Sequence, residues 1–360
     1  QGDISALLIN SGNANAMTGE QGEKLAANSA ELLSSALGLE AYNTLIASTG
    51  VIGVHPKPRA FELGIPQLVD SLNADTEALS AVSKAILTTD LVTKHYSISH
   101  EINGRSYTFT GISKGSGMIC PNMATFIGII LTDAPLSAHS AQYVLNTISF
   151  SSFNAITVDG DTSTNDTFAL MASKVNEHDS EMSEKLNDFN SPEFEELLEC
   201  FFEVALKISE AVARDGEGAT KLLRVVVSGA ESSVDAKQVA FTIAHSPLVK
   251  TAIFGCDANW GRVAAAAGRS GVPFGSNNLR IEFASILTCE NGEAVAFSEE
   301  EALAALSKDE VSIHVHLGLR ELHESDFDSA FTINPNEGVA GVMTCDFSYD
   351  YVRINGEYRS

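Results

Sequence analysis

Thr125 lies in the stretch NMATFIGIIL, between a turn of small residues and an apolar run. A threonine hydroxyl is a poor nucleophile unless a base lies within hydrogen-bond reach, and no Ser/His/Asp order is evident in this sequence. Cleavage of the preceding peptide bond would supply that base, because the new α-amine has a pKa of about 8 and can accept the hydroxyl proton. Ala124 is small enough to leave its carbonyl open to attack. Local chemistry therefore leaves two interpretations of Thr125, a self-cleaving nucleophile and a buried strand threonine.

A second turn, in the segment ASTGVIG, has the residue types of an oxyanion hole. Thr49 and Gly50 follow the apolar LIAS, and small residues there let backbone N–H groups approach a ligand closely. Taken alone, the segment is more typical of an ordinary turn between a strand and a helix.

Three other motifs lack the features of a metal or phosphate site. In DGDTSTNDTFAL the oxygen-bearing residues match the first positions of a calcium loop, but Thr164 replaces the required glycine and Leu170 the required glutamate, so an Asx-type turn fits better. GEGATK lacks the spacing of a phosphate-binding loop. His314 and His316 share one face of an expected strand, with no third ligand type nearby in the sequence. We therefore expect no metal in this protein.

Composition and charge exclude several classes of partner. The 360 residues are 44% hydrophobic, enough for two domains with real cores. The formal net charge of -25 opposes binding to nucleic acid, which depends on Lys and Arg neutralising phosphates. No apolar run approaches the roughly 20 residues that a membrane-spanning helix needs. Five widely spaced cysteines, an odd number without a ligand pattern, indicate reduced thiols in a reducing compartment.

The elements that must position Thr125 can be predicted from periodicity and turn residues. Apolar spacing predicts an amphipathic helix over 22–39, with Gly38 as its stop. Asn103 and Gly104 suit the turn of a β-hairpin, because both central positions of a type I′ turn need a positive φ. The second hairpin strand leads into a Gly- and Pro-containing loop at 114–121, and the apolar strand FIGIIL follows.

Downstream, Ser191 and Pro192 predict the start of a long helix that ends near Arg214. Gly216 stops that helix and sets Glu217 just beyond its last turn. The segment SAHSAQYVLNTISFSSFNAI reads as a helix that leads to a strand, and LLRVVVSGA reads as another strand. Because helices and strands alternate in pairs rather than as strict βα units, we expect a layered α/β sandwich rather than a doubly wound parallel sheet.

Five ordered blocks of the sequence resemble the bifunctional ornithine acetyltransferase (glutamate N-acetyltransferase) family of the cyclic arginine pathway: INSGNANAMTGEQG, KGSGMICPNMATFIG, SFNAITVDGDTSTNDT, DANWGRVAAAAGRSG and YDYVRINGEYRS. They span nearly the whole chain. The resemblance implies an α-β-β-α sandwich of the ornithine acetyltransferase/DmpA aminopeptidase type, with a smaller C-terminal α/β domain. We accordingly expect a catalytic domain at 1–235 and a second domain at 236–360, whose tail returns to the active site.

The resemblance also implies the role of the candidate nucleophile. It makes Thr125 the nucleophile of a self-processing family, released by cleavage after Ala124 into chains 1–124 and 125–360. Thr49 and Gly50 match the oxyanion-hole pair of the family, which reverses the weaker local interpretation of that turn.

Further matches imply a binding site for amino-acid substrates. Lys114 and Glu217 fall on the family's charged contacts. Asn355 and Ser360 match residues that close over the substrate, although family members more often end in threonine. Thr88 is the expected counterpart of another substrate-binding threonine, with the neighbouring Thr89 as the alternative.

The activity implied by the family is a ping-pong transfer of acetyl from N2-acetyl-L-ornithine to L-glutamate through an acetyl-Thr125 intermediate. No metal or organic cofactor is implied, and acetyl-CoA as a second donor stays open. The two cleavage fragments are expected to assemble as an α2β2 heterotetramer. Bacterial members are cytoplasmic and fungal members lie in the mitochondrial matrix. Members usually begin some tens of residues before the counterpart of ALLINSGNANA, and that segment would carry any targeting peptide. Two interpretations stay open: the segment is absent, which would remove an edge of the sheet, or it was trimmed, which would change nothing.

Two rival functions remain at this point. An aminopeptidase or amidase of the same scaffold would use water as the acceptor, and the charged pair and the terminal segment argue instead for transfer. A non-catalytic binding protein would keep an intact chain in which Thr125 is structural.

Overall fold

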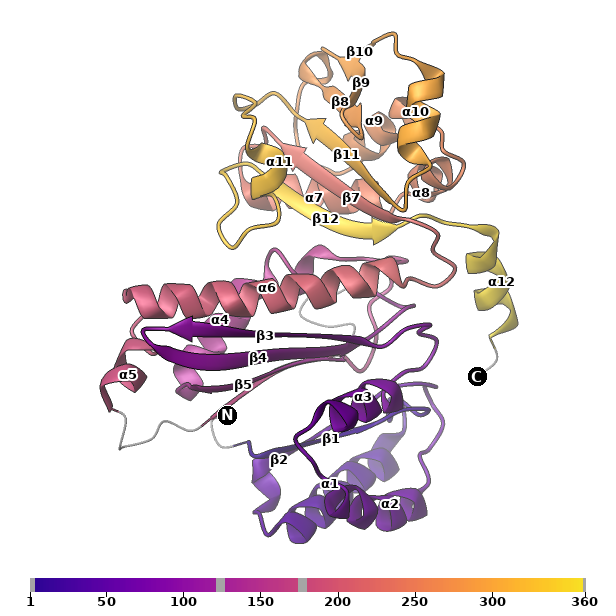
Figure 1. Cartoon of the computed structure of the whole chain (residues 1–360). Coiled ribbons are helices and arrows are strands. Elements are labelled where there is room, and N and C mark those ends of the chain that lie inside the picture. The colour runs from indigo at the N-terminus through magenta and orange to yellow at the C-terminus, as the bar shows by residue number, and fades with distance from the viewer. Residues whose placement is uncertain (1–3, 121–126, 174–179, 359–360) are drawn as a thin grey trace.

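The computed structural model describes residues 4–120, 127–173 and 180–358. Within these residues the chain forms two stacked units, an α/β sandwich followed by a unit around a six-stranded sheet (Figure 1). A last helix runs back from the second unit along one side of the molecule (Figure 1).

Two sheets form the inner layers of the sandwich. The first pairs the parallel strands β1 (Ala6–Asn10) and β2 (Thr44–Ser48). The second has the order β3-β4-β5-β6, with bounds Lys94–Ile102, Arg105–Lys114, Ile127–Pro135 and Thr167–Ser173. An apolar cluster joins the two sheets, made of Leu7, Ile9, Ala47, Ile127 and Ile129.

Helices cover the outer faces of both sheets (Figure 1). Below the first sheet lie α1 (Gly19–Leu37) and α2 (Pro58–Asp70), and α3 (Thr76–Ala85) follows. On the second sheet lie α4 (Ala138–Ser149) and α6 (Pro192–Arg214), and α5 spans Ser180–Lys185. The order helix, sheet, sheet, helix confirms the predicted α-β-β-α sandwich, and α1 ends at Gly38 (φ 69°), the predicted stop.

Helix α6 fixes the second sheet in place. It begins where the sequence predicts, because the Ser191 hydroxyl accepts a hydrogen bond from Phe194 N–H and Pro192 occupies the first turn. Its buried stripe packs on β3 and β4, where Phe201 meets Phe109 edge to face with ring centroids 4.9 Å apart. Burial of one such side chain contributes about 1.5–3 kcal/mol. The stripe therefore anchors the strand that carries Lys114.

The predicted hairpin is also confirmed. Asn103 and Gly104 have φ values of 49° and 79°, as a type I′ turn requires. Strand β4 then pairs antiparallel with β5, so that Lys114 lies opposite Ile127. This register brings the last residue of β4 to the start of the strand that follows Thr125.

The strand expected after α4 is wrong. The chain forms a 3-10 turn at Phe153–Ala155 and a single bridge from Ile156 to Met343, and β6 begins only after the polar loop. Phe153, Ala155 and Ile156 are buried in the core shared by α6 and the second unit. These apolar side chains are therefore buried between the two units without the segment forming a strand.

The second unit is built on a sheet of order β10-β9-β8-β11-β7-β12. Its strands are β7 (Leu222–Ser228), β8 (Arg280–Phe283), β9 (Ile286–Glu290), β10 (Glu293–Ala294), β11 (Glu310–His316) and β12 (Ala340–Cys345). Its helices are α7 (Ser233–Ala244), α8 (Pro247–Phe254), α9 (Trp260–Gly268), α10 (Glu299–Leu306) and α11 (Asp326–Ser329). Besides the 3-10 turn at Phe153–Ala155, the described residues form 3-10 turns at Ala41–Asn43 and Ser276–Asn278.

The domain boundary predicted after residue 235 is wrong. Strand β7 lies inside the six-stranded sheet, between β11 and β12, so the sandwich ends at 215–221. Because β7 forms ladders with β11 on one edge and β12 on the other, it belongs to the second unit.

The last helix, α12 (Tyr349–Glu357), returns to the sandwich as expected for the C-terminal tail. It is attached through Gly218, whose carbonyl accepts a hydrogen bond from Ser348 Oγ at 2.5 Å. Gly218 has φ 68°, and a Cβ atom there would lie 2.3 Å from Tyr351 N. The close approach of α12 to the loop after α6 therefore requires glycine at 218.

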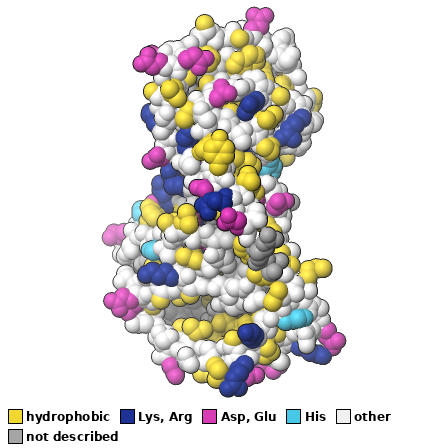
Figure 2. Space-filling view, turned by 90° about the vertical axis from the view of Figure 1, so that its right-hand side faces the viewer, with side chains coloured by type: hydrophobic (Ala, Val, Ile, Leu, Met, Phe, Trp, Pro, Cys, Tyr) yellow, Lys and Arg dark blue, Asp and Glu magenta, His cyan; other side chains and the backbone are white. Residues whose placement is uncertain are grey.

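The surface and the thiols agree with the composition. Figure 2, which views the side of the molecule that faces right in Figure 1, shows acidic side chains scattered over this face and a hollow in its lower half. In the described part of the chain, no helix combines the length and the apolar character needed to cross a membrane. All five cysteines are free, as predicted.

Candidate active site

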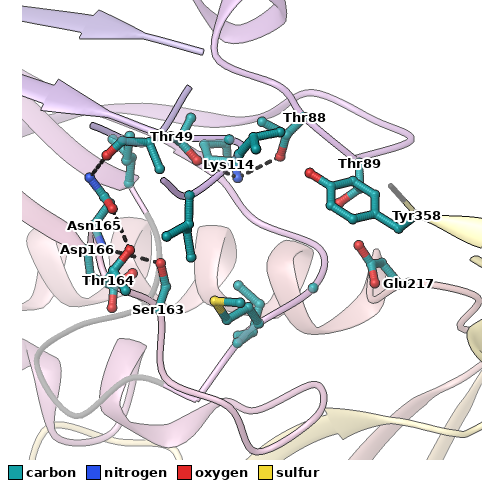
Figure 3. A pocket seen from close by; sticks show the side chains of 18 of the residues that line it. Thr49, Thr88, Thr89, Lys114, Ser163, Thr164, Asn165, Asp166, Glu217 and Tyr358 are labelled. Carbon is teal, nitrogen blue, oxygen red and sulfur yellow. Dashed lines mark hydrogen bonds between the residues drawn. The ribbon is translucent and has the colours of Figure 1, made fainter. Parts of the chain in front are cut away.

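A cavity of about 340 Å³ lies where the loops of the sandwich meet α12. Every predicted site residue that the structure describes lines it: Thr49, Gly50, Thr88, Lys114, Glu217 and Asn355. Figure 3 shows Lys114 between Thr49 and Thr88, with Glu217 and Tyr358 at the other end. Residues from five separate segments of the chain therefore converge on one cavity.

Lys114 is the cation of this cavity. It ends β4, is 8% exposed, and donates hydrogen bonds from Nζ to Thr88 Oγ1 (2.8 Å) and Thr49 Oγ1 (3.2 Å). Burial lowers the pKa of Lys114, and the nearby acids Asp90, Asp166 and Glu217 only partly offset this effect. An ammonium has three donors, so one remains for an anionic ligand.

Of the two neighbouring candidates Thr88 and Thr89, Thr88 is the one that contacts Lys114. Thr89 also lines the cavity, but Thr88 Oγ1 accepts the hydrogen bond from the lysine. The backbone N–H of Thr88 is held by Asp90 Oδ2 at 3.1 Å, which fixes the local turn. The geometry therefore favours Thr88 of the two alternatives.

The turn of Thr49 and Gly50 lies at the end of β2. Thr49 N–H bonds to Asn10 O at 2.9 Å, so the hydroxyl is the donor that Thr49 can offer to a ligand. Gly50 has φ 124°, and a Cβ atom there would lie 2.3 Å from the carbonyl carbon of Gly12. Only glycine allows this packing of the two turns, which keeps the Gly50 backbone at the cavity wall.

Glu217 is the carboxylate of the cavity that lies next to α12. It is 8% exposed, and its Oε2 accepts a hydrogen bond from Asn355 Nδ2 at 2.9 Å. Asn355 comes from α12 and also donates to Tyr351 O at 3.0 Å. Opposite the carboxylate lies Gly117, where a Cβ atom would be 2.4 Å from Glu217 Cδ. The carboxylate thus fills the space that glycine leaves free.

Three of the predicted site residues lie outside the described part of the chain. These are Ala124, Thr125 and Ser360. The described neighbour Ile127 lines the cavity, as do Met118 and Ile119 on the other side of the segment 121–126.

The polar loop at 163–166 is part of the cavity wall and was missed as a site by sequence reasoning. Asn165 Nδ2 donates to Ser48 Oγ at 2.9 Å and also to Ala14 O, and so connects this loop to the end of β2. Asp166 lines the cavity and is one of the acids that raise the pKa of Lys114. The sequence does show a run of Asp, Ser, Thr and Asn residues here, but such a run is equally typical of an Asx turn.

The arrangement supports acyl chemistry on a small zwitterionic ligand. A buried ammonium and a buried carboxylate at separate places in one cavity suit a ligand with a carboxylate and an amine. Polar donors at the Thr49 turn suit a tetrahedral oxyanion. Among the residues that the structure describes, no group of three or more His, Cys, Asp and Glu side chains could hold a metal ion.

Comparison with known proteins agrees with this geometry. Residues 1–360 match the ArgJ family. The chain is 43% identical over 353 residues to arginine biosynthesis bifunctional protein ArgJ 1 of Nostoc sp., covering 98% of this chain and 82% of that protein. It is 41% identical over 353 residues to the chloroplastic ArgJ protein of Populus trichocarpa, covering 98% and 70%. The crystal structure of the ArgJ protein of Bacillus halodurans is 36% identical and superposes with a TM-score of 0.55, over 65% of this chain and 100% of that chain.

Proposed function

The chain belongs to the ArgJ family of bifunctional arginine-biosynthesis proteins, and from this premise we propose that it transfers the acetyl group of N2-acetyl-L-ornithine to L-glutamate. The main support for the proposal is that a buried lysine, Lys114, and a buried glutamate, Glu217, line the same cavity as the Thr49 turn. This set of charges suits both the α-carboxylate that the two substrates share and the amine of ornithine.

In the proposed complex Lys114 binds the α-carboxylate and Glu217 binds the side-chain ammonium of ornithine. Thr88 keeps Lys114 oriented toward the substrate. Asn355, together with Ser360, closes the cavity from the C-terminal side. The hydrogen bond from Asn355 to Glu217 supports this part of the proposal.

We propose that the reaction is ping-pong and that Thr125 is the nucleophile. Its α-amine, freed by cleavage of the Ala124–Thr125 bond, takes the proton of Oγ as Oγ attacks the acetyl carbonyl. The tetrahedral oxyanion accepts hydrogen bonds from Thr49 and Gly50. The C–N bond then breaks, the ornithine nitrogen takes the proton, and acetyl-Thr125 remains. The amine of glutamate then attacks the acetyl carbonyl of acetyl-Thr125, the ester bond to Oγ breaks, and N-acetylglutamate leaves the site.

The proposed chemistry needs no metal or organic cofactor, because an acetyl group moves from an amide to an ester and back to an amide. Acetyl-CoA is a candidate second donor, since a thioester is attacked by the same hydroxyl. The proposed assembly is an α2β2 heterotetramer of the two cleavage fragments. The proposed compartment depends on the source, being the cytoplasm in a bacterium and the mitochondrial matrix in a fungus.

Denaturing electrophoresis and an acetyl-transfer assay on the same sample test the proposal. The wild-type protein should give fragments 1–124 and 125–360, with threonine at the N-terminus of the second, and should form N-acetylglutamate from N-acetylornithine. Thr125→Ala should stay intact and inactive. Thr132 lies on β5, and its hydroxyl accepts a hydrogen bond from Ala134 N at 3.1 Å, so Thr132→Ala should be cleaved and active. An intact wild-type chain without transfer would refute the proposal, and acetate as the main product would instead indicate an amidase.

A further inference from the structure

Three charged side chains lie next to the cavity without lining it. Lys94 is 1% exposed, and its Nζ donates to Asp90 Oδ1 at 2.7 Å and to Asp215 Oδ2 at 2.6 Å. The side chains of the two acids are 0% and 8% exposed. We refer to Asp90, Lys94 and Asp215 as the buried bridge. The proposed reaction does not use it directly.

One end of the buried bridge holds the surroundings of Lys114. Asp90 Oδ1 also accepts the backbone N–H of Gly115 at 2.6 Å, and Asp90 Oδ2 accepts that of Thr88. A single carboxylate therefore fixes the residue after Lys114 and the residue that accepts its hydrogen bond. Burial raises the pKa of Asp90, but Lys94, Lys114 and the N–H of Gly115 together bring it below its ordinary value, so the carboxylate stays ionised.

The other end of the buried bridge holds the segment of Glu217. Asp215 caps α6 at its C-terminus, and its Oδ2 accepts the N–H of Leu91 at 3.1 Å. Ser116 Oγ donates to Asp215 O at 2.6 Å, and Ser116 O accepts the N–H of Glu217 at 2.9 Å. The backbones on either side of the cavity are thus tied to each other through the bridge and through Ser116.

Stability alone is a weak reason for such a bridge. Removing charges from water costs about as much as their attraction returns, so a buried ion pair adds little net stability. The bridge does, however, connect three chain segments that border the cavity, at 88–94, 114–117 and 215–217. Its geometric effect is to fix where the ammonium of Lys114 and the carboxylate of Glu217 can lie.

We propose, on the basis of the proposed function, that the buried bridge sets the distance between Lys114 and Glu217 and thereby selects the acetyl donor by the length of its side chain. Asp90, Lys94 and Asp215 are then positioning residues. A donor with one methylene more or fewer would fit one anchor or the other, but not both. One methylene typically changes kcat/KM by about 10–200-fold.

The test compares three acetyl donors with glutamate as the acceptor: the N2-acetyl derivatives of ornithine, lysine and 2,4-diaminobutyrate. Asp215→Asn keeps the shape of the side chain and an oxygen that can accept the N–H of Leu91, but it removes the charge that pairs with Lys94. We expect it to reduce the preference for acetylornithine over acetyllysine by about tenfold, with the larger change in KM. Asp90→Asn should do the same. Because it also removes an acid that supports the charge of Lys114, it should move the alkaline limb of kcat/KM to lower pH.

Asp133→Asn is the matched control, since Asp133 is an exposed sandwich residue that accepts the N–H of Thr108 at 2.7 Å. It should leave the preference unchanged. If Asp90→Asn does not fold, Asp215→Asn carries the test, because the side chain of Asp215 is 8% exposed whereas that of Asp90 is fully buried. Folded bridge variants that keep the wild-type preference, or lose activity equally for all three donors, overturn this inference alone. A wild-type protein that transfers no acetyl group overturns the proposed function as well.

Discussion

The two ends of the cavity are built in different ways. The Lys114 end belongs to one unit, where a strand terminus, a hydroxyl pair and Asp90 hold a lysine that is 8% exposed. The Glu217 end is made from two units, because its partner Asn355 comes from α12 beyond the second sheet. Helix α12 has no buried residue of its own, and Tyr349 and Val352 are 84% and 71% exposed.

This difference teaches how one site can serve two substrates. Ornithine and glutamate share an α-carboxylate, so the anchor for that group can be fixed in the core of the sandwich. Their side chains differ in charge, so the end of the cavity that contacts them should be able to adapt. An element such as α12, which can move away at a small cost in free energy, suits that end. A helix with little buried apolar area is drawn from the least stable part of a fold. The predictions below separate the fixed end from the end closed by α12.

The largest effect is expected at the fixed end. Lys114→Met keeps most of the side-chain volume but removes the charge, so both the donor and the acceptor lose their carboxylate anchor. A charge-assisted hydrogen bond to a buried anion is worth about 2–4 kcal/mol, which corresponds to a loss of kcat/KM of about 30-fold to 10³-fold for both half-reactions. Steady-state kinetics with acetylornithine and with glutamate as the varied substrate measure this.

Lys84→Met serves as the control for that loss, because Lys84 is an exposed lysine on α3 of the same unit. It should retain the kinetics of the wild type. A Lys114→Met enzyme that is impaired with only one of the two substrates would contradict the assignment of a shared carboxylate anchor.

A smaller and more selective effect is expected for Gly117→Ala. The added Cβ would lie 2.4–2.5 Å from three atoms of the Glu217 carboxylate, so that carboxylate must move. We expect KM for acetylornithine to rise about tenfold, as is typical when one charged contact is misplaced, and KM for glutamate to change little. Gly64→Ala, with open space at its Cβ position, is the matched control. Equal losses for both substrates would show that the substitution damages the whole cavity.

Much of the architecture could be predicted from the sequence, because the signals were local. The helix that begins at Pro192 could be predicted from its N-cap residue and its apolar face. The hairpin turn could be predicted from the residue types Asn103 and Gly104. The strand expected before the polar loop was wrong, because burial against the second unit, which includes Met343, is a tertiary effect. No local pattern distinguishes it from a strand.

The site shows the same division. Lys114 and Glu217 could be assigned because whole blocks of sequence matched a family. Asn165 and Asp166 were missed as cavity residues, since nothing in a run of small polar residues shows which of them faces a cavity formed from distant segments. Lys94 was missed for a related reason, because its two acidic partners, Asp90 and Asp215, are four and 121 positions away in the sequence.

At the end closed by α12, Asn355→Ala should have a modest effect. It removes one hydrogen bond to Glu217 Oε2 at 2.9 Å, and such bonds to a charged group are worth about 1.5–3 kcal/mol when fully buried. Because α12 is exposed, we expect the lower part of that range or less, a rise of about fivefold in KM for acetylornithine. Arg353→Ala, on the same helix but paired with Asp350 at 2.9 Å, is the control. A loss as large as that of Lys114→Met would mean that the two ends are equally rigid.

The smallest effect concerns the alkaline limb of the pH profile, which is set mainly at the fixed end because burial is the largest cause of the lowered pKa of Lys114. The charged form of Lys114 binds the carboxylate, so kcat/KM should fall as the pH rises through the pKa of this lysine. Burial lowers that pKa, so the fall should begin at a lower pH than an exposed lysine would give. The acidic limb should follow the α-amine of Thr125, with a pKa of about 8 for an unperturbed amine. Lys114→Met should abolish the alkaline limb, whereas Asn355→Ala should keep both limbs. If Asn355→Ala loses its alkaline limb as Lys114→Met does, the charge of Lys114 depends mainly on the Glu217 end, and the contrast between the two ends fails.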